Sequence, residues 1–589
     1  MKRILLVLLI AMGLYAQAQV YNNEWIDYSK TYYKFKVATT GLYRIPQSVL
    51  SGAGLGAVPA EQFQLWRNGQ QIPIYTSVPT GALGGSDYIE FWGEMNDGKP
   101  DNALYRNPDY QLNDKWSLQT DTAAFFLTVN PGGGNFHYST TTNNVAGNTL
   151  APEPFFVYIA GNYYRDQINP GYAASVGEYV YSASYDIGEG WTSPNVGPVG
   201  SLNYTFSNLH VYSGGPDPSL RVNVSGNAIN PRSIRVKVNG DSTLGQEVDY
   251  FDYAKMTGTF PIGKLSSDAA AIEMANICNV TTDRMVVHKV ELTYPRQFNF
   301  DNLTNFKFTL SASSTGNYLE ISNFQYGSTA PVLYDLTNGT SYIADITNPA
   351  LIKIALLPSA TDRQLLLVSR DVSTIKTVTS LQTRNFVNYA QSAYQGDYII
   401  ISHPNLNTSS DGTNYVEAYR AYRASAAGGG FTSRIYDINQ LVDQFGFGIK
   451  KHPLSIRNFL GWARANFALP LKNVFLIGHG ITYQQYRTYE SDPNSEILNM
   501  VPTWGDPASD NLLSSTFTNP VPLTPIGRIS VINGDEIKSY FQKVKEYETA
   551  QASPSPYIAD KAWMKNVVHV VGSSDEQLGV MLTDYMDKY

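Results

Sequence analysis

The stretch Asp397-Tyr398-Ile399-Ile400-Ile401 decides the fold of the C-terminal part of this chain. An unbroken apolar run of this kind is typical of a strand that is buried on both faces of a sheet. Residues 474–477 form a second such run, and residues 434–437 predict a third strand. Helical patterns at residues 416–427 and 453–467 separate these strands. Alternating strands and helices predict a parallel α/β sheet.

The alternation continues toward the C-terminus. Residues 536–548 predict a further helix, because Ile537, Phe541 and Val544 align on one face. Residues 567–571, which read Val-Val-His-Val-Val, predict the next parallel strand. Since α/β sheets bind ligands at the carboxyl ends of their strands, candidate site residues are expected directly after each strand.

Residues before 385 follow the period-2 alternation and the frequent turns of all-β domains. The pair Asn68-Gly69 follows an alternating run and predicts a tight hairpin. The sequence therefore indicates a multidomain protein whose N-terminal all-β domains, β-sandwich-like in part, precede the α/β domain. The predicted divisions are residues 19–130 (N-terminal β-rich domain), 131–151 (linker), 152–330 (β-sandwich-like domain), 331–384 (connecting β segment), 385–560 (first α/β subdomain) and 561–589 (start of a second subdomain).

Residues 1–18 have the pattern of a secretory signal peptide. Lys2 and Arg3 precede a short apolar stretch, and Ala16-Gln17-Ala18 is a small-residue cleavage site that would leave Gln19 at the N-terminus. The alternative is a membrane anchor, which needs about 20 apolar residues. The sequence predicts export to the cell surface, to an outer membrane-associated position or to the medium, with no transmembrane segment.

The charge and the cysteine content limit the classes of molecule that this chain is expected to bind and the ways in which it is stabilised. The formal net charge is −8 and no block of Lys and Arg occurs, which excludes nucleic acid and anionic membranes as expected partners. A single cysteine excludes an intrachain disulfide framework. The histidines are not spaced as metal ligands, and the sequence has no phosphate-binding loop motif. No cofactor is therefore predicted, although the sequence allows a calcium site.

Gly478-His479-Gly480 directly follows the strand at residues 474–477. A histidine at this edge of a sheet is where a general base would lie. Alternatively, His479 is a polar loop residue, and its glycines only permit a tight turn. No cysteine or serine lies in the sequence relation to it that a nucleophile elbow would require.

The loop at residues 501–513 reads VPTWGDPASDNLL and carries two carboxylates, Asp506 and Asp510, four residues apart. Such a pair could bind calcium or position a cationic group. The competing interpretation is turn chemistry, in which aspartates accept hydrogen bonds from backbone amides.

Cys278 lies among apolar neighbours in the all-β region. A lone cysteine in that setting is usually a small buried hydrophobic residue. It could serve as a nucleophile only if it acted from a different domain.

Several motifs resemble the gingipain family of cysteine peptidases. Residues 397–401, Gln444-Phe445, residues 456–460 and residues 474–480 resemble the start of that family's peptidase domain. The next signatures of that domain follow in the same order. They resemble the loop at residues 501–513, then Ile526-Gly527-Arg528-Ile529 with Lys543 and Tyr547-Glu548, and then Trp563 with residues 567–572. Residues 41–45 and 87–91 resemble the PorU-like sortases of the type IX secretion system within this family.

The resemblance implies a first α/β subdomain followed by a caspase-like second one that carries the catalytic His and Cys, each after a strand. Both residues are then expected beyond Tyr589, and the 589-residue chain is expected to be inactive alone. His479 falls where the family has an ordinary strand-end loop. The loop at Asp575 and Glu576 falls where gingipains have acidic residues of the substrate pocket. The alternative for these two carboxylates is to cap a helix.

The resemblance implies an exported cysteine peptidase, a PorU-like sortase that acts on polypeptides such as secreted cargo proteins and meets components of the secretion system. The alternative is a non-catalytic surface adhesion or carbohydrate-binding protein with a degenerate peptidase scaffold, because a fold does not establish a chemistry.

Overall fold

The computed structural model describes residues 20–175, 178–516, 518–573 and 575–588. The predicted signal peptide, residues 1–18, lies outside the described residues. The chain divides into two compact units. The larger unit comprises the residues up to 404 and residues 420–532, and the smaller unit comprises residues 405–419 and 533–589. The helices of the described ranges include none that is long and apolar enough to cross a membrane.

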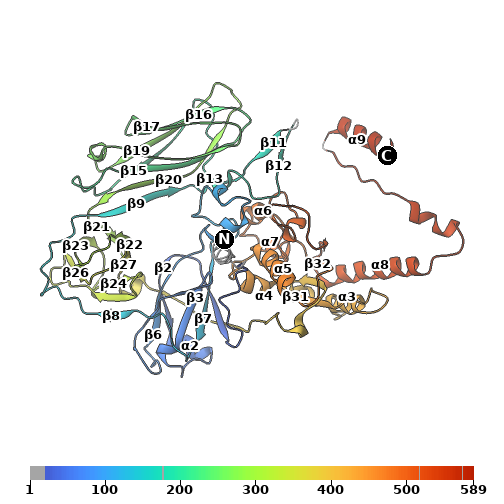
Figure 1. Cartoon of the computed structure of the whole chain (residues 1–589), viewed down its shortest axis with the longest axis horizontal. Helices are drawn as coiled ribbons and strands as arrows, with labels where there is room; N and C mark the ends of the chain where they lie inside the picture. The colour runs from blue at the N-terminus through green and yellow to red at the C-terminus, as the bar shows by residue number, and fades with distance from the viewer. Residues whose placement is uncertain (1–19, 176–177, 517, 574, 589) are drawn as a thin grey trace, which may run out of the picture. The chain divides into compact units, whose positions relative to one another are not determined.

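The first strands of the larger unit, drawn in blue in Figure 1, form a pair of sheets to which two short strands from residues 376–384 add. Their strand orders are β29-β1-β7-β3-β4 and β28-β2-β6-β5. The rings of Phe35, Phe91 and Phe125 pack together between them, with centroids 5.5–5.6 Å apart. The predicted hairpin at Asn68-Gly69 joins β3 to β4. The elements are β1 (Tyr32–Val37), β2 (Gly41–Pro46), α2 (Gln47–Gly52), β3 (Phe63–Arg67), β4 (Gln70–Ile72), β5 (Tyr75–Thr76), β6 (Tyr88–Gly93), β7 (Ala123–Val129), β28 (Lys376–Thr377) and β29 (Gln382–Arg384).

A β-sandwich follows, with strand orders β14-β19-β16-β17 and β18-β15-β20-β9. Inward residues of both sheets, such as Val236 and Val290, are fully buried in one core. Two small ribbons, β10-β13 and β11-β12, accompany it. The strands are β9 (Phe156–Tyr163), β10 (Gln167–Pro170), β11 (Ala173–Ser175), β12 (Tyr179–Tyr181), β13 (Glu189–Thr192), β14 (Ser201–Phe206), β15 (Ser219–Gly226), β16 (Arg232–Val238), β17 (Asp241–Val248), β18 (Tyr253–Thr259), β19 (Ala270–Ile277) and β20 (Met285–Arg296).

A further pair of sheets has the strand orders β22-β27-β24-β25-β8 and β21-β23-β26 and its own phenylalanine-rich core. Its strands come from three of the ranges into which the sequence was divided, because period-2 alternation is the same on both sides of a boundary between all-β domains. They are β8 (Ser139–Thr141), β21 (Asn299–Leu303), β22 (Asn305–Leu310), β23 (Asn317–Phe324), β24 (Val332–Asp335), β25 (Thr340–Ile343), β26 (Ile352–Leu356) and β27 (Arg363–Val368).

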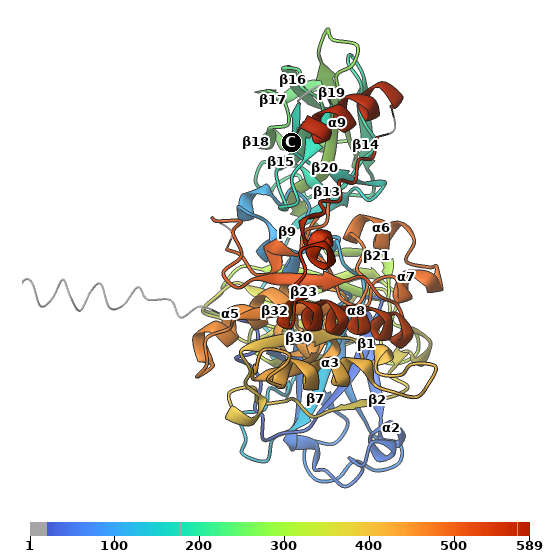
Figure 2. The same ribbon diagram turned by 90° about the vertical axis from the view of Figure 1, so that its right-hand side faces the viewer.

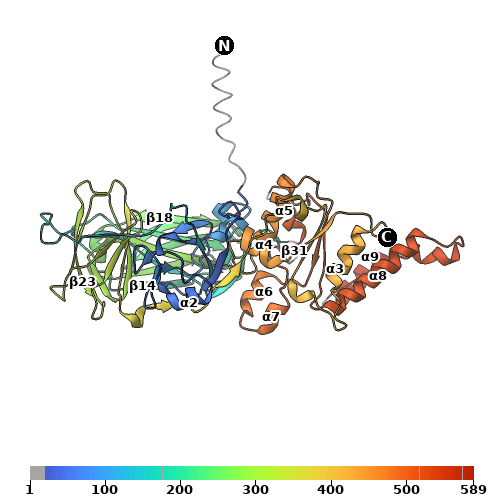
Figure 3. The ribbon, with the colours of Figure 1, turned by 90° about the horizontal axis from the view of Figure 1, so that it is seen from below.

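The last part of the larger unit is a parallel sheet with the order β31-β30-β32-β33. Figure 2 shows β30 and β32, which are directly paired. Residues Ile399, Ile401, Val474 and Leu476 share a core with helices α4 and α5, which Figure 3 shows beside β31. The elements are β30 (Tyr398–Ser402), β31 (Ser433–Asp437), α4 (Ile438–Phe445), α5 (Leu454–Asn466), β32 (Asn473–Ile477), α6 (Tyr483–Thr488), α7 (Pro493–Ile497) and β33 (Ile526–Ile529).

The smaller unit holds the start of α3 (Tyr415–Ala424), α8 (Gly534–Ala552) and α9 (Glu576–Lys588). Ser410 donates to Asp535, and Lys538 pairs with Asp411 at 2.9 Å, so residues 405–419 pack on the start of α8. The strand predicted at residues 567–571 is wrong for this structure. Val567, Val568 and Val570 are 74–87% exposed, and no described strand pairs with them. An apolar run becomes a strand only when a neighbour accepts its backbone hydrogen bonds.

Candidate functional site

The carboxyl ends of the parallel strands meet at one edge of the sheet. Ser402 at the end of β30 pairs with Ile477 of β32, which pairs with Ile529 of β33. The loop Gly478-His479-Gly480 and the loop at residues 501–513 lie at this edge, because the amide of Val501 donates to the carbonyl of His479 at 3.1 Å. The sequence places its candidate site here, and the structure brings both candidate loops together.

Arg528 and Asp510 bind these loops to the sheet, and we call the pair the strand-end clamp. The Nε and Nη2 atoms of Arg528 donate to the two carboxylate oxygens of Asp510, each at 2.7 Å. Nη1 donates to the carbonyls of Gly478 and Val501 at 2.8 and 2.7 Å, and Nη2 also donates to Pro502 at 3.1 Å. A bidentate guanidinium–carboxylate pair is strong and directional. The clamp therefore fixes the geometry of this edge.

His479 is engaged in these contacts. Its Nδ1 lies 2.6 Å from the carbonyl oxygen of Leu498, which can only accept, so Nδ1 carries the proton. Its backbone amide donates to Val531 at 2.9 Å. A Cβ atom at Gly480 would lie 2.6 Å from the carbonyl of Val501, so this glycine permits the close approach of the two loops. These contacts give His479 a role in holding the loops.

The calcium candidates Asp506 and Asp510 differ in their surroundings. Both carboxylate oxygens of Asp510 accept hydrogen bonds from the guanidinium of Arg528. A bound calcium ion would need further oxygen ligands at this position, where the structure has a positively charged side chain. Partial burial raises the pKa of Asp506, which a hydrogen bond from Thr482 partly offsets. Among the residues that the structure describes, no three His, Cys, Asp or Glu side chains gather as metal ligands would. The geometry favours a structural role for this pair of carboxylates.

Cys278 follows β19 in the sandwich and is buried. Its Sγ lies 3.3 Å from the carbonyl of Pro231 and 3.5 Å from the amide of Val280. Both are backbone groups that cannot act as a general base. The structure thus places this sulfur as a small buried hydrophobic group, as its sequence neighbours indicated.

Asp575 and Glu576 lie at the start of α9 in the smaller unit. The Oδ1 atom of Asp575 accepts from the amide of Leu578 at 2.8 Å, which is the geometry of a helix cap. Glu576 is the first residue of the helix, where the helix dipole favours negative charge. These contacts support capping, and a pocket role for the two carboxylates stays a prediction.

Sequence reasoning missed how the loop at residues 501–513 is held against the β-rich region. Trp504 is 1% exposed, with the guanidinium of Arg457 4.4 Å from its ring and Tyr185 packed edge-on at 5.5 Å. Burial lowers the pKa of Arg457 to about 10. Gly505 has φ +68°, and a Cβ atom there would lie 1.7 Å from the carbonyl oxygen of Ala183. Only glycine fits this approach.

Sequence reasoning also gave no sign of the role of Glu189 in β13. Its carboxylate accepts from the hydroxyl of Tyr483 in α6 and from the amide of Asp186, the latter at 2.9 Å. Complete burial raises its pKa well above the ordinary value, more than these hydrogen bonds lower it. Glu189 and Tyr483 are 294 residues apart, so no local pattern could reveal the pair.

Comparisons with known proteins agree with this architecture. Residues 391–589 match the model of peptidase family C25. No curated protein sequence matches the chain. The crystal structure of dimeric latent PorU from Porphyromonas gingivalis is similar, with a TM-score of 0.58 and 13% identity over 95% of this chain and 53% of that chain. This chain thus spans about half the length of that PorU chain.

Carbohydrate-binding modules also match, over a small part of the chain. They include a CBM36-1 domain of a xylanase from the hindgut metagenome of Trinervitermes trinervoides, with 9% identity over 23% of this chain and 95% of that chain. A CBM36 in complex with calcium and xylotriose has 12% identity over 23% and 98%. Both TM-scores are 0.15. The family match and the similarity to PorU confirm the resemblance predicted from the sequence: residues 391–589 match peptidase family C25, and the chain has a fold similar to that of PorU.

Proposed function

We propose that this chain belongs to an exported cysteine peptidase that acts as a PorU-like sortase on secreted polypeptides. The observation that carries the proposal is the family C25 match over residues 391–589 within a chain that shares the PorU fold along 95% of its length. The predicted signal peptide at residues 1–18 supports export to the cell surface.

The chemistry of the proposed enzyme starts with a thiolate that attacks a peptide carbonyl. A histidine takes the thiol proton and later donates a proton to the leaving amine, and backbone amides stabilise the oxyanion. In a sortase, an amine takes the place of water and attacks the acyl-enzyme. Because the sulfur of Cys278 is buried and its hydrogen bonds join it to backbone groups, the proposal takes its nucleophile from outside these 589 residues.

The described residues then supply the scaffold of the active site. The strand-end clamp holds Gly478, Val501 and Pro502 through their carbonyl oxygens at the carboxyl edge of the sheet. That edge is where α/β folds position ligands. A fixed edge lets neighbouring catalytic groups keep their geometry without reorganisation during the reaction.

The test uses the protein isolated from its native source, incubated with peptides drawn from secreted proteins of the same source, with and without an added primary amine. We expect cleavage, and a product joined to the amine when it is present. Hydrolysis without any amine adduct would reject the sortase role. No cleavage of any peptide, with retained binding to cells or to polysaccharide, would reject the peptidase and support the alternative of a non-catalytic adhesion or carbohydrate-binding protein.

A further inference from the structure

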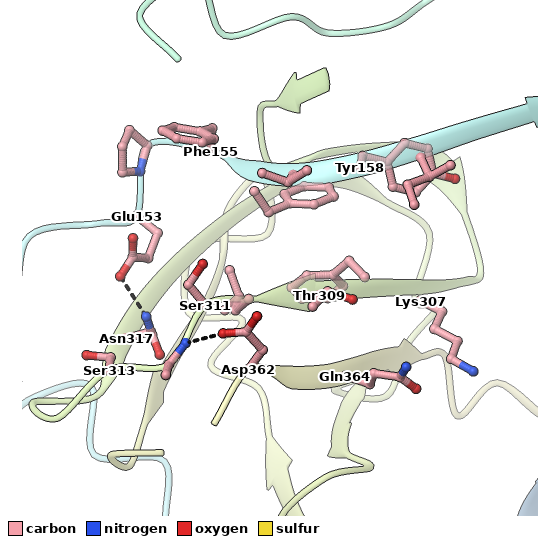
Figure 4. Close-up of a pocket in the computed structure, with 17 residues that line it drawn as sticks. Glu153, Phe155, Tyr158, Lys307, Thr309, Ser311, Ser313, Asn317, Asp362 and Gln364 are labelled. Atoms are coloured by element: carbon pink, nitrogen blue, oxygen red, sulfur yellow. Dashed lines mark hydrogen bonds between the residues drawn. The ribbon is translucent and has the colours of Figure 1, made fainter. Parts of the chain in front are cut away.

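Two cavities of the larger unit differ in how the charges of their side chains are balanced. The groove between β9 and β22, shown in Figure 4, has a volume of about 800 Å³. Dashed lines mark the hydrogen bonds that Asp362 accepts from a backbone amide and that Glu153 accepts from the side-chain amide of Asn317. Lys307 pairs with Glu94 at 2.9 Å. The charged side chains that line this groove are thus satisfied within the protein.

The second cavity has the opposite character, and we call it the arginine cavity. It is lined by helix α5, residues 20–22 and the loop that precedes β33, and its volume is about 570 Å³. Arg457 and Arg464 line it together with neutral side chains such as Asn458 and Leu523. No aspartate or glutamate is among the described residues that form its wall. The arginine cavity therefore has two positive charges in its lining and no negative charge to balance them.

Both arginines extend from one face of α5. They are seven residues apart, which corresponds to about two turns and about 10 Å along the helix axis. Gly461 lies between them, and a Cβ atom there would lie 2.9 Å from a ring atom of Tyr21. The glycine thus lets Tyr21 pack closely on the helix between the two arginines. The period of the helix brings both guanidinium groups to the same cavity.

Arg457 is largely withdrawn from water, with 8% of its surface exposed. Its guanidinium lies 4.4 Å from the ring centre of Trp504. Burial and the positive charge of Arg464 lower the pKa of Arg457 to about 10. Both causes disfavour the charged form of the side chain, whereas a negative charge nearby would favour it. The surroundings of Arg457 are therefore complementary to an anion.

Arg464 lies beside neutral hydroxyl groups. Its Nη1 atom is 3.4 Å from the hydroxyl oxygens of Ser514 and Thr524, which is long for a hydrogen bond. Burial lowers the pKa of Arg464, and the nearby Tyr21 offsets this in part. A ligand that supplied a negatively charged oxygen would make shorter and stronger bonds to this guanidinium than the two hydroxyls do.

We infer that the arginine cavity binds a small solute through an oxyanion, a phosphate or a carboxylate group, held by Arg457 and Arg464. The planar fork of a guanidinium matches the oxygens of both groups. The volume of the cavity is within the range of about 300–1,000 Å³ that small-molecule sites occupy. The inference goes beyond the proposed function, because binding in this cavity requires no nucleophile and no catalysis.

The test is a calorimetric titration of the full chain with inorganic phosphate and, separately, with succinate, at an ionic strength held constant with chloride. We expect at least one anion to bind, and the one that binds more tightly identifies the group. Arg464→Met keeps the apolar stem of the side chain but removes its charge, so it should weaken binding at least about tenfold. Arg464→Lys keeps the charge without the fork and should weaken binding less.

A second pair of variants adds a charge without removing an arginine. Thr516 lines the cavity at an exposed position, and its hydroxyl accepts from the amide of Asn519 at 3.0 Å. Thr516→Asp keeps an acceptor for this amide and brings a negative charge to the cavity, whereas Thr516→Asn, the matched control, keeps the acceptor without the charge. Thr516→Asp should weaken binding of the anion, and Thr516→Asn should bind it as the parent chain does.

Three results would overturn the inference. The first is that neither anion binds to the parent chain. The second is that Arg464→Met binds the anion as tightly as the parent, which would place the anion elsewhere on the surface. The third is equal affinity in Thr516→Asp and Thr516→Asn, which does not depend on whether Arg464→Met folds.

Discussion

Asp510→Ala should loosen the carboxyl edge of the parallel sheet. The Arg528 side chain is 9% exposed and that of Asp510 is 23% exposed. Removing one partner of a buried pair costs about 3–5 kcal/mol, because the remaining charge loses its counter-ion. Since Asp510 keeps some contact with water, we expect the lower value, about 3 kcal/mol. At 1.4 kcal/mol per factor of ten, amides at this edge should exchange about a hundredfold faster.

Hydrogen exchange of β32 and β33 measures this effect locally, which suits a chain of several domains better than one global unfolding curve. Strands β1 and β7 serve as the internal reference and should not change. The double variant Asp510→Ala/Arg528→Met should recover part of the loss, because no buried charge is left unpaired. Unchanged protection in Asp510→Ala would refute the clamp. If removal of calcium from the parent chain lowers the hydrogen-exchange protection of β32 and β33, the calcium-binding interpretation of Asp506 and Asp510 is supported instead.

Three further changes test other parts of the structure. Burial raises the pKa of Glu189, so the contribution of its carboxyl group to stability is full below the unfolded pKa of about 4.3 and is lost as the pH rises through the folded pKa. The melting temperature of Glu189→Gln should therefore rise relative to that of the parent chain as the pH is raised. Melting temperatures that change with pH in parallel for the two proteins would contradict this. Gly505→Ala should lower stability by about 1–3 kcal/mol because its Cβ meets a carbonyl oxygen, whereas Gly527→Ala, with open space around it, should not; equal effects would be inconsistent with the packing. Asp575→Ala should destabilise α9 by about 0.5–2 kcal/mol in exchange measurements, unlike Asp587→Ala at the other end of the helix, and an unaffected helix would reject the cap.

The sequence predicted the strands that are buried on both faces. Residues 398–401 and 474–477 are unbroken apolar runs, and both are strands in the structure. It missed β33, because Gly527 and Arg528 interrupt the apolar pattern of that short strand. It wrongly assigned a strand to residues 567–571, where the apolar pattern is present but no described strand supplies hydrogen bonds. An apolar sequence pattern indicates that a segment prefers to be buried, but the segment forms a strand only where a neighbouring strand pairs with it.

The site was predictable in position but not in chemistry. Parallel topology alone places the loops after β30 and β32 at one edge. The partners of the candidate residues were not predictable, because they are set by tertiary contacts: Asp510 meets Arg528 from another element, and Glu189 meets Tyr483 across 294 residues. The motif Gly-His-Gly reads as a catalytic candidate in sequence, whereas in the structure its histidine ring contacts the carbonyl of Leu498.

The most direct test of the central claim is to treat the 589-residue chain with an irreversible thiol-directed peptidase probe and with peptide substrates. The account holds that these residues form a gingipain-like scaffold in which Cys278 is a buried structural residue. It predicts no turnover and no rapid labelling of the folded chain, with the same result for Cys278→Ser. Turnover that disappears in Cys278→Ser, together with a probe attached to Cys278, would contradict it.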